Sequence, residues 1–166
     1  MRPKTQYRIA ANIACVPALL NVILSFNDAA DIEGELMDTE HNSDIEYYTS
    51  EILKDLPFSA AVRAGRMLYL SGQIGIDDSG KLVSGGIGAE TRQAMENIRA
   101  TLEQCGSSLD HVIKATVMLA DMSEWSEMNK VYITYFGKHL PARSALGANG
   151  LALGARVEIE CIAVLP

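Results

Sequence analysis

The spacing of apolar residues between positions 87 and 102 constrains the fold more than any other feature of the sequence. Apolar or small side chains recur there every three to four residues, as on the buried face of an α-helix. They are Ile87, Thr91, Ala94, Met95, Ile98 and Leu102. Gly106 follows and can take the left-handed conformation that ends a helix. We therefore expect a helix over about residues 88–104 that packs against another layer.

Short β-forming segments lie on both sides of this helix. We expect strands at residues 59–63, 67–72, 112–119, 143–146 and 156–165. The first two are separated by the turn Ala64-Gly65-Arg66, so they are expected to form a hairpin. Residues 46–52 mix β-forming and polar side chains and are either an edge strand or the lead into one.

A second helix is expected from Ser123, its N-cap, to Gly137, which ends it. Its apolar face carries Trp125, Met128, Val131, Tyr132 and Tyr135. The order β-β-α-β-α-β-β places two helices on one face of a single sheet, which is a two-layer α+β domain. Residues 157–164 change from polar alternation to apolar on both sides, so we expect self-association to cover the other face of the sheet.

The net charge of −7 is spread unevenly along the chain. Residues 1–26 carry three basic side chains and no acid, and residues 27–44 carry seven acids and no base. The remainder, 45–166, is mildly acidic, with 11 bases and 14 acids. Nucleic-acid affinity depends largely on neutralising phosphates with Lys and Arg. The charge therefore argues against a nucleic-acid partner.

The first 44 residues divide into two segments ahead of the domain at 45–166. Residues 9–26 are mostly apolar and follow a short basic stretch, the outline of a signal peptide or an N-terminal anchor. A mispredicted start, or a helix that packs on the domain or a partner, are the alternatives. Residues 27–44 form an acidic linker. We expect export or membrane anchoring in preference to a cytoplasmic location, with membrane contact only through residues 1–26.

The cysteines and histidines give no pattern typical of metal or disulfide chemistry. Cys15, Cys105 and Cys161 are far apart and form no CxxC pair, and the histidines are equally scattered. We therefore expect buried or spectator thiols and no metal site.

Four stretches of the domain match one known family in order and approximate separation. They are Pro57-Phe58-Ser59, Leu70-Ser71-Gly72-Gln73-Ile74, residues 91–98 (TRQAMENI), and Pro141-Ala142-Arg143-Ser144 followed by Val157-Glu158-Ile159-Glu160. On these motifs, residues 45–166 resemble the Rid (reactive intermediate deaminase, or YjgF) family. The resemblance implies a chorismate-mutase-like fold and a homotrimer, with the sheets packed into a central barrel and clefts between subunits.

The resemblance also implies an activity and a substrate class. The best-understood Rid branch hydrolyses reactive enamines and imines, such as 2-aminoacrylate, to the 2-oxo acid and ammonia, without cofactor or metal. Arg143 matches the residue that binds the substrate carboxylate, a task suited to the two parallel donors of a guanidinium. Glu158 matches the carboxylate that activates the attacking water, so both residues are expected to be catalytic.

Further substrate-binding positions follow from the same resemblance. Backbone groups near Ser71 and Gly72 would hold the other end of the ligand, and Phe58, Trp125 and Tyr132 would line the pocket. Two positions depart from the family. Phe58 replaces a tyrosine found in many members, and Ala145 replaces the cysteine of archetypal members, which puts the substrate preference in doubt.

Two other functions remain open on the sequence. The same cleft suits a non-catalytic trimer that binds small carboxylates or acts as a chaperone, and turnover of an imine would separate the two. Cleavage of RNA, proposed for relatives, fits the acidic charge least. The structural alternatives are that Arg143 serves in an interface ion pair and that Glu158 and Glu160 belong to a solvated strand face.

Overall fold

The computed structural model describes residues 45–49 and 55–166. The predicted leader or anchor (1–26) and the acidic linker (27–44) lie outside these residues, as do positions 50–52 of the expected first strand.

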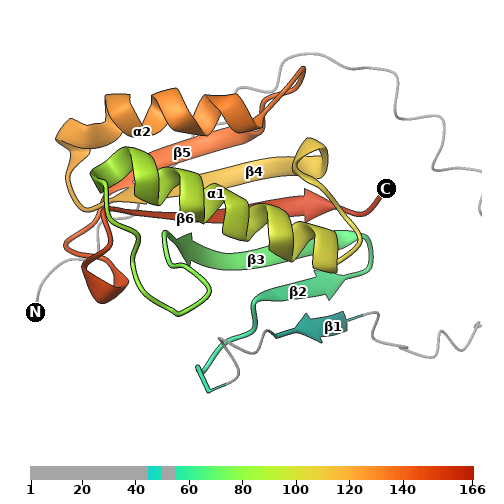
Figure 1. Ribbon diagram of the computed structural model, residues 1–166. Coiled ribbons are helices and arrows are strands. Elements are labelled where there is room, and N and C mark those ends of the chain that lie inside the picture. Colours follow the sequence, from blue (N-terminus) through green and yellow to red (C-terminus); the bar gives the residue numbers. More distant parts are fainter. Residues whose placement is uncertain (1–44, 50–54) are drawn as a thin grey trace, which may run out of the picture. The chain divides into compact units, whose positions relative to one another are not determined.

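One six-stranded sheet forms the base of the domain (Figure 1). Its strands, in spatial order, are β1 (Ile45–Tyr48), β2 (Ala61–Ala64), β3 (Met67–Ile74), β6 (Val157–Val164), β4 (Val112–Leu119) and β5 (Ala142–Gly147). Neighbouring strands are antiparallel except β4 and β5, which are parallel. The second helix joins these two, as a parallel connection requires a crossover.

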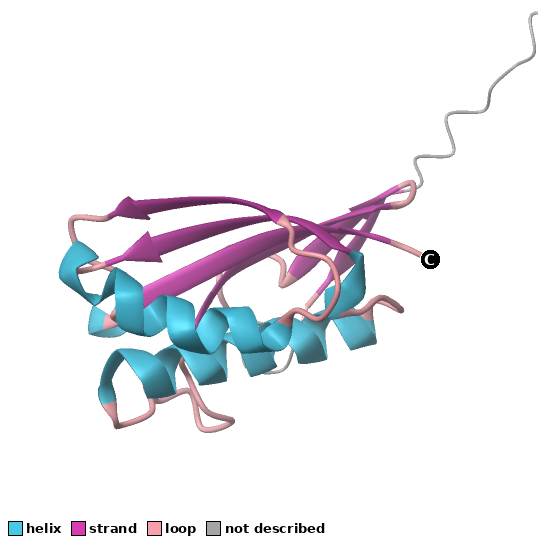
Figure 2. Cartoon of the chain, turned by 90° about the horizontal axis from the view of Figure 1, so that it is seen from above, coloured by secondary structure: helices cyan, strands magenta, loops and turns pink. Residues whose placement is uncertain are grey.

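Both helices, α1 (Gly86–Gln104) and α2 (Trp125–Tyr132), lie on the same face of the sheet (Figure 2). The described residues also form four 3₁₀ turns, at Leu109–His111, Met122–Glu124, Ile133–Tyr135 and Ala152–Gly154. The apolar stripe of α1 is almost completely buried against β3 and β6, with Met95, Ile98 and Leu102 at 0% exposure. The predicted two-layer α+β class is therefore confirmed.

Helix α1 ends as its sequence predicts. Gly106 has a φ of 77°, and its N–H donates to the carbonyl of Glu103 while the N–H of Ser107 donates to that of Leu102. This pair of bonds satisfies carbonyls that the helix end would otherwise leave without partners. At its other end the helix begins at Gly86, two residues before the predicted start.

The edge-strand alternative for residues 46–52 is confirmed at Ile45–Tyr48, which pairs with Ala61–Ala64 along its whole length, so the element order becomes β-β-β-α-β-α-β-β. Two expectations for the second helix need correction. The N-cap expected at Ser123 is wrong, because Oδ1 of Asp121 accepts the N–H of Ser123 and begins a 3₁₀ turn that leads into α2. The α-helix then ends at Tyr132 rather than near Gly137, and the last turn tightens into a 3₁₀ helix.

The face of the sheet remote from the helices carries exposed apolar side chains. Tyr69 alternates with the buried Leu68 and Leu70 and is 47% exposed, and Leu146 is 45% exposed. Coverage of this face by self-association stays a prediction. Among the residues described, no helix is long and apolar enough to cross a bilayer.

Candidate functional site

Arg143 lies over two aromatic rings of the second helix. It pairs in register with Ala115 of β4, whose side chain is buried in the core, so Arg143 points to the helix side of the sheet. Its guanidinium carbon is 4.6 Å from the ring centre of Tyr132 and 5.8 Å from that of Trp125. Attraction between a cation and ring faces at these distances holds the guanidinium in place.

A pocket of about 360 Å³ opens beside this guanidinium. Its walls are Asn129, Tyr132, Ile133, Leu140, Pro141 and Arg143. Within residues 45–49 and 55–166, Arg143 makes no ion pair, so its charge is available to a bound anion. An arginine fork in a largely apolar pocket suits the two oxygens of a carboxylate.

Tyr132 forms the floor beneath Arg143. The residue is only 4% exposed, its ring packs 4.9 Å from that of Phe136, and its hydroxyl has no hydrogen-bond partner among the described residues. Burial raises the pKa of Tyr132 to about 12, while the positive charge of Arg143 acts in the opposite direction. The hydroxyl is therefore neutral at physiological pH, with its donor proton unused.

Ala145 lies two residues beyond Arg143 on β5, on the same side of the sheet. It pairs with the buried Val117 and packs partly against the core. Its methyl group stands where archetypal Rid proteins are expected to carry a thiol. We refer to Arg143, Ala145, Tyr132 and Trp125 as the arginine half-site.

Glu158 lies on β6, beside a β-bulge in β3. The register between β3 and β6 shifts between Leu70 and Gln73, so Ser71 and Gly72 form the bulge. A Cβ atom on Gly72 would lie 1.9 Å from Oε1 of Glu158, which means that only glycine leaves room for this carboxylate. The bulge therefore places the backbone of Gly72 directly against the Glu158 side chain.

The surroundings of Glu158 favour its protonated form more than water does. Partial burial raises the pKa of the carboxyl above its ordinary value, and the negative charge of Glu160 raises it further. Within the part of the chain that is described, Glu158 forms no ion pair that would counteract this. A carboxylate with a raised pKa is a stronger base for activating water.

Ser71 joins this region to the segment that carries Phe58. Its hydroxyl donates to the carbonyl of Ser59 at 2.7 Å and its N–H donates to the carbonyl of Ala60 at 3.0 Å. Both donors are thus used within the chain, so Ser71 anchors the segment, and Gly72 is the better candidate for a backbone contact with a ligand. Phe58 is 48% exposed. We refer to Glu158, Gly72, Ser71 and Phe58 as the glutamate half-site.

The two half-sites face opposite sides of the sheet. Glu158 pairs with Met118 and alternates with the buried Val157 and Ile159, so it points away from the helices. Arg143 lies on the helix side, two strands away and level with Cys161. The strand spacing and rise separate the two Cα atoms by roughly 14 Å. One chain therefore cannot bring Arg143 and Glu158 onto the same small molecule.

Sequence reasoning did not identify Asn129, Leu140 or Pro141 as pocket residues. Asn129 follows Trp125 by four positions and precedes Tyr132 by three, a helical spacing that places all three on one face and could have indicated it. Leu140 and Pro141 lie in the loop before β5, whose path no periodic pattern predicts. In the described segments no three His, Cys, Asp or Glu side chains come together as metal ligands would.

Comparison with known proteins identifies the class to which this fold and site belong. Residues 49–165 match the family model described as Endoribonuclease L-PSP. The chain belongs to this family, which includes the Rid proteins that its motifs resemble.

Individual relatives carry more specific names. The chain is 47% identical over 109 residues to the 2-iminobutanoate/2-iminopropanoate deaminase of Mus musculus. The aligned segment covers 65% of this chain and 81% of the mouse protein. The human protein of the same name is 43% identical, and the aligned segment covers 65% of this chain and 80% of the human protein. Among solved structures, yeast Mmf1 superimposes with a TM-score of 0.69 at 36% identity over 74% of this chain and 99% of that chain. RidA from an Antarctic Psychrobacter superimposes with a TM-score of 0.65 at 34% identity, and the match covers 74% of this chain and 98% of that chain.

Proposed function

We propose that this protein hydrolyses small 2-imino acids to 2-oxo acids and ammonia and so removes reactive enamine and imine intermediates. Membership of the family supports this, as do the deaminase names of relatives that are 43–48% identical. Escherichia coli TdcF, a further structural relative at 31% identity, was solved with bound serine, a small molecule that carries a carboxylate.

The observation that carries the proposal is the guanidinium of Arg143. It is held over Tyr132 and Trp125, beside a pocket, without an ion-pair partner in the described part of the chain. A purely structural arginine would be expected to pair with a neighbouring acid. A 2-imino acid offers a carboxylate next to its reactive carbon, so binding at Arg143 would also place the imine group.

Glu158 supplies the chemistry in this proposal. The carboxylate of Glu158 takes one proton from a water as its oxygen adds to the imine carbon, and then gives that proton to the nitrogen, which forms an amino alcohol. Glu158 next takes the hydroxyl proton and passes it to the nitrogen as the carbon–nitrogen bond breaks, which yields the 2-oxo acid and ammonia and restores the carboxylate. One water is consumed and no electrons are transferred, so the reaction needs no cofactor. The bulge at Gly72 keeps the carboxylate close to backbone that a bound ligand could contact.

A second copy of the chain completes the site. Because Arg143 and Glu158 face opposite sides of one sheet, we propose a homotrimer in which each cleft combines the arginine half-site of one chain with the glutamate half-site of its neighbour. The exposed Tyr69 and Leu146 on the helix-free face fit burial in such an assembly. Sedimentation equilibrium of the full chain should give three times 18.0 kDa.

The first test is hydrolysis of 2-imino acids generated in place by an amino-acid oxidase, followed by the release of ammonia. The full chain should accelerate hydrolysis, and Arg143→Ala and Glu158→Gln should each abolish the acceleration while preserving the assembly. A folded assembly that hydrolyses no imino acid but binds a 2-oxo acid at Arg143 would instead support the non-catalytic carboxylate-binding function.

Mixed assemblies test the shared cleft directly. Arg143→Ala and Glu158→Gln chains, unfolded and refolded together in equal amounts, should regain activity, because some clefts receive a normal residue from each chain. Random mixing restores about a quarter of the clefts in a closed ring. Activity that stays absent in the mixture would contradict a site formed between chains.

We further propose that residues 9–26 direct export or anchor the protein in a membrane. Basic residues followed by an apolar stretch support this. Fractionation of cells that produce the full chain, compared with a chain lacking residues 1–26, tests it. Equal recovery of both proteins from the cytoplasm would contradict it.

A further inference from the structure

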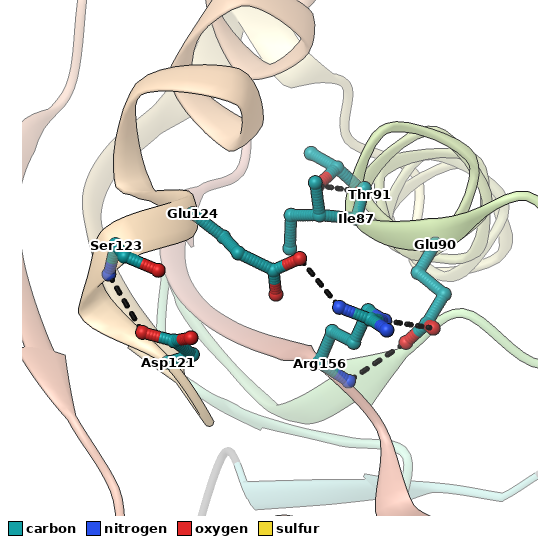
Figure 3. Close-up of polar contacts among 7 residues, drawn as sticks. All are labelled: Ile87, Glu90, Thr91, Asp121, Ser123, Glu124 and Arg156. Carbon is teal, nitrogen blue, oxygen red and sulfur yellow. Dashed lines mark hydrogen bonds and ion pairs between the residues drawn. The ribbon is translucent and has the colours of Figure 1, made fainter.

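Arg156 joins three separate segments through two carboxylates (Figure 3). Its backbone N–H donates to Oε2 of Glu90 at 2.8 Å, and its Nε lies 3.9 Å from Oε1 of the same residue. Its Nη1 donates to Oε1 of Glu124 at 2.5 Å. Glu90 belongs to the first turns of α1, Glu124 ends the 3₁₀ turn before α2, and Arg156 leads into β6. We refer to these three residues as the Arg156 bridge.

The bridge lies partly out of water. The side chain of Glu90 is 8% exposed and that of Glu124 is 21% exposed, whereas the side chain of Arg156 is 50% exposed. Removal of the Arg156 guanidinium would leave the two carboxylates, of which Glu90 is the more buried, without a compensating charge, and their segments would have to move to solvate them. The positions of the three segments therefore depend on one another.

Each end of the bridge adjoins one half-site. Glu124 directly precedes Trp125, whose ring lies 5.8 Å from the Arg143 guanidinium. Arg156 precedes Glu158 by two residues on the same chain segment, and its carbonyl accepts the N–H of Ala120 after β4. Glu90 packs closely on Gly75 after β3, where a Cβ would meet its Cα at 2.6 Å.

We propose that Arg156 is a positioning residue, which through Glu124 sets the place of Trp125 in the arginine half-site and through Glu90 sets the place of Glu158 in the glutamate half-site. None of the three residues lines the pocket or belongs to either half-site, so the bridge acts only through its neighbours. The catalytic consequence rests on the proposed deaminase function, whereas the placement of Trp125 does not.

Steady-state kinetics of the full chain separate the two arms. Glu124→Gln should raise KM for the imino acid by roughly tenfold with little change in kcat, because it disturbs the Trp125 side where the carboxylate binds. Glu90→Gln should lower kcat by roughly tenfold with little change in KM, because it disturbs the start of β6. Arg156→Met should show both effects.

The matched control is Arg99→Met. Arg99 also forms an ion pair, with Glu96 at 2.8 Å, and lies over the ring of Tyr135, but it contacts neither half-site. This variant should keep the kcat and KM of the unaltered protein. Thermal unfolding of all variants shows whether each remains folded. If Arg156→Met does not fold, the two glutamine variants, which keep the shape of the side chains, decide the outcome.

Trp125 gives a measurement that needs no catalysis, because it is the single tryptophan of the chain. Glu124→Gln should shift its fluorescence emission and increase its quenching by acrylamide, and Arg99→Met should change neither. If the unaltered protein hydrolyses no imino acid, the proposed function fails, and the fluorescence still decides whether the bridge positions Trp125. Unchanged Trp125 quenching in Glu124→Gln overturns the inference, as does a folded Arg156→Met variant with unaltered kcat and KM.

Discussion

The carboxylate of Glu158 occupies the space that a side chain at Gly72 would need, with Oε1 only 1.9 Å from the position of a Cβ atom. This contact depends on the bulge that turns Gly72 toward β6. Glu158, the base proposed for catalysis, can thus take this position only because the neighbouring strand has no side chain at Gly72.

Substitution of Gly72 by alanine should therefore separate catalysis from folding. The atoms in the way, Oε1 at 1.9 Å, Cδ at 2.8 Å and Cγ at 2.9 Å, all belong to the flexible side chain of Glu158. The side chain can therefore swing aside, and we expect the free energy of unfolding to fall by about 1 kcal/mol. Turnover should fall by roughly 100-fold, because the base is displaced by an ångström or more. Chemical denaturation and kinetics measure the two effects. Gly137→Ala, where a Cβ meets nothing within 4 Å, is the control and should leave both unchanged.

The pH dependence of turnover should reveal the raised pKa of Glu158. The active form is the carboxylate, so activity should rise with pH through this pKa. Glu160 contributes to the raised value, and Glu160→Gln should move the acid limb of the kcat profile to lower pH while turnover is retained. An acid limb at the same pH in Glu160→Gln would assign it to another group.

The same group affects stability with a defined sign. A folded-state pKa above the unfolded value means that the folded protein binds more protons, so the stabilising contribution is full below the unfolded pKa and is lost as pH rises through the folded pKa. Glu158→Gln removes the ionisable group and with it the loss of stability at higher pH. The variant should therefore be more stable than the unaltered chain at neutral pH. Thermal unfolding at acidic and neutral pH tests it, and equal melting temperatures at neutral pH would contradict it.

Replacement of Arg143 should weaken the binding of a 2-oxo acid. We expect Arg143→Ala to lose roughly 2–5 kcal/mol of binding free energy, by analogy with other desolvated charge contacts. Arg143→Lys keeps the charge but loses the planar fork, so its affinity should lie between that of the unaltered protein and that of Arg143→Ala. Isothermal titration calorimetry with 2-oxobutanoate measures the series. An affinity for Arg143→Ala equal to that of the unaltered protein would remove Arg143 from the site.

The hydroxyl of Tyr132 gives opposite expectations for stability and binding. Because it is buried without a partner among the described residues, Tyr132→Phe should raise the free energy of unfolding of the ligand-free protein by about 1 kcal/mol. If the hydroxyl donates to a ligand in the pocket, the same variant should bind a 2-oxo acid more weakly. A destabilised Tyr132→Phe protein would show that the hydroxyl is already satisfied.

The sequence predicted the helices and most strands because their side chains repeat with the right period. The stripe from Ile87 to Leu102 and the β-branched run at 112–119 belong to elements whose bounds agree with the structure to within two residues. The residue that caps the turn leading into α2 was harder to predict from the sequence. Asp121 and Ser123 are both good capping residues, and only the backbone geometry decides between them.

The candidate site was predictable as a set of residues but not as an arrangement. Motifs indicate Arg143 and Glu158, yet their opposite orientations depend on strand order and on the register of β4 against β5 and β6. The bulge at Ser71 and Gly72 is equally hidden, because one extra residue in a strand leaves no periodic trace over so short a run. The Arg156 bridge joins residues 32 and 66 positions apart, a separation that no local pattern reports.

The two described thiols are buried and therefore react slowly with reagents in solution. Burial raises the pKa of Cys105 and brings that of Cys161 to about 12, so neither is a ready target for alkylating or oxidising reagents. With Cys15, which lies outside the described residues, changed to serine, an Ala145→Cys protein would carry one partly buried sulfur two residues from Arg143, on the same side of the sheet. A thiol-directed label would then attach beside the pocket, and protection by a bound 2-oxo acid would report its occupancy.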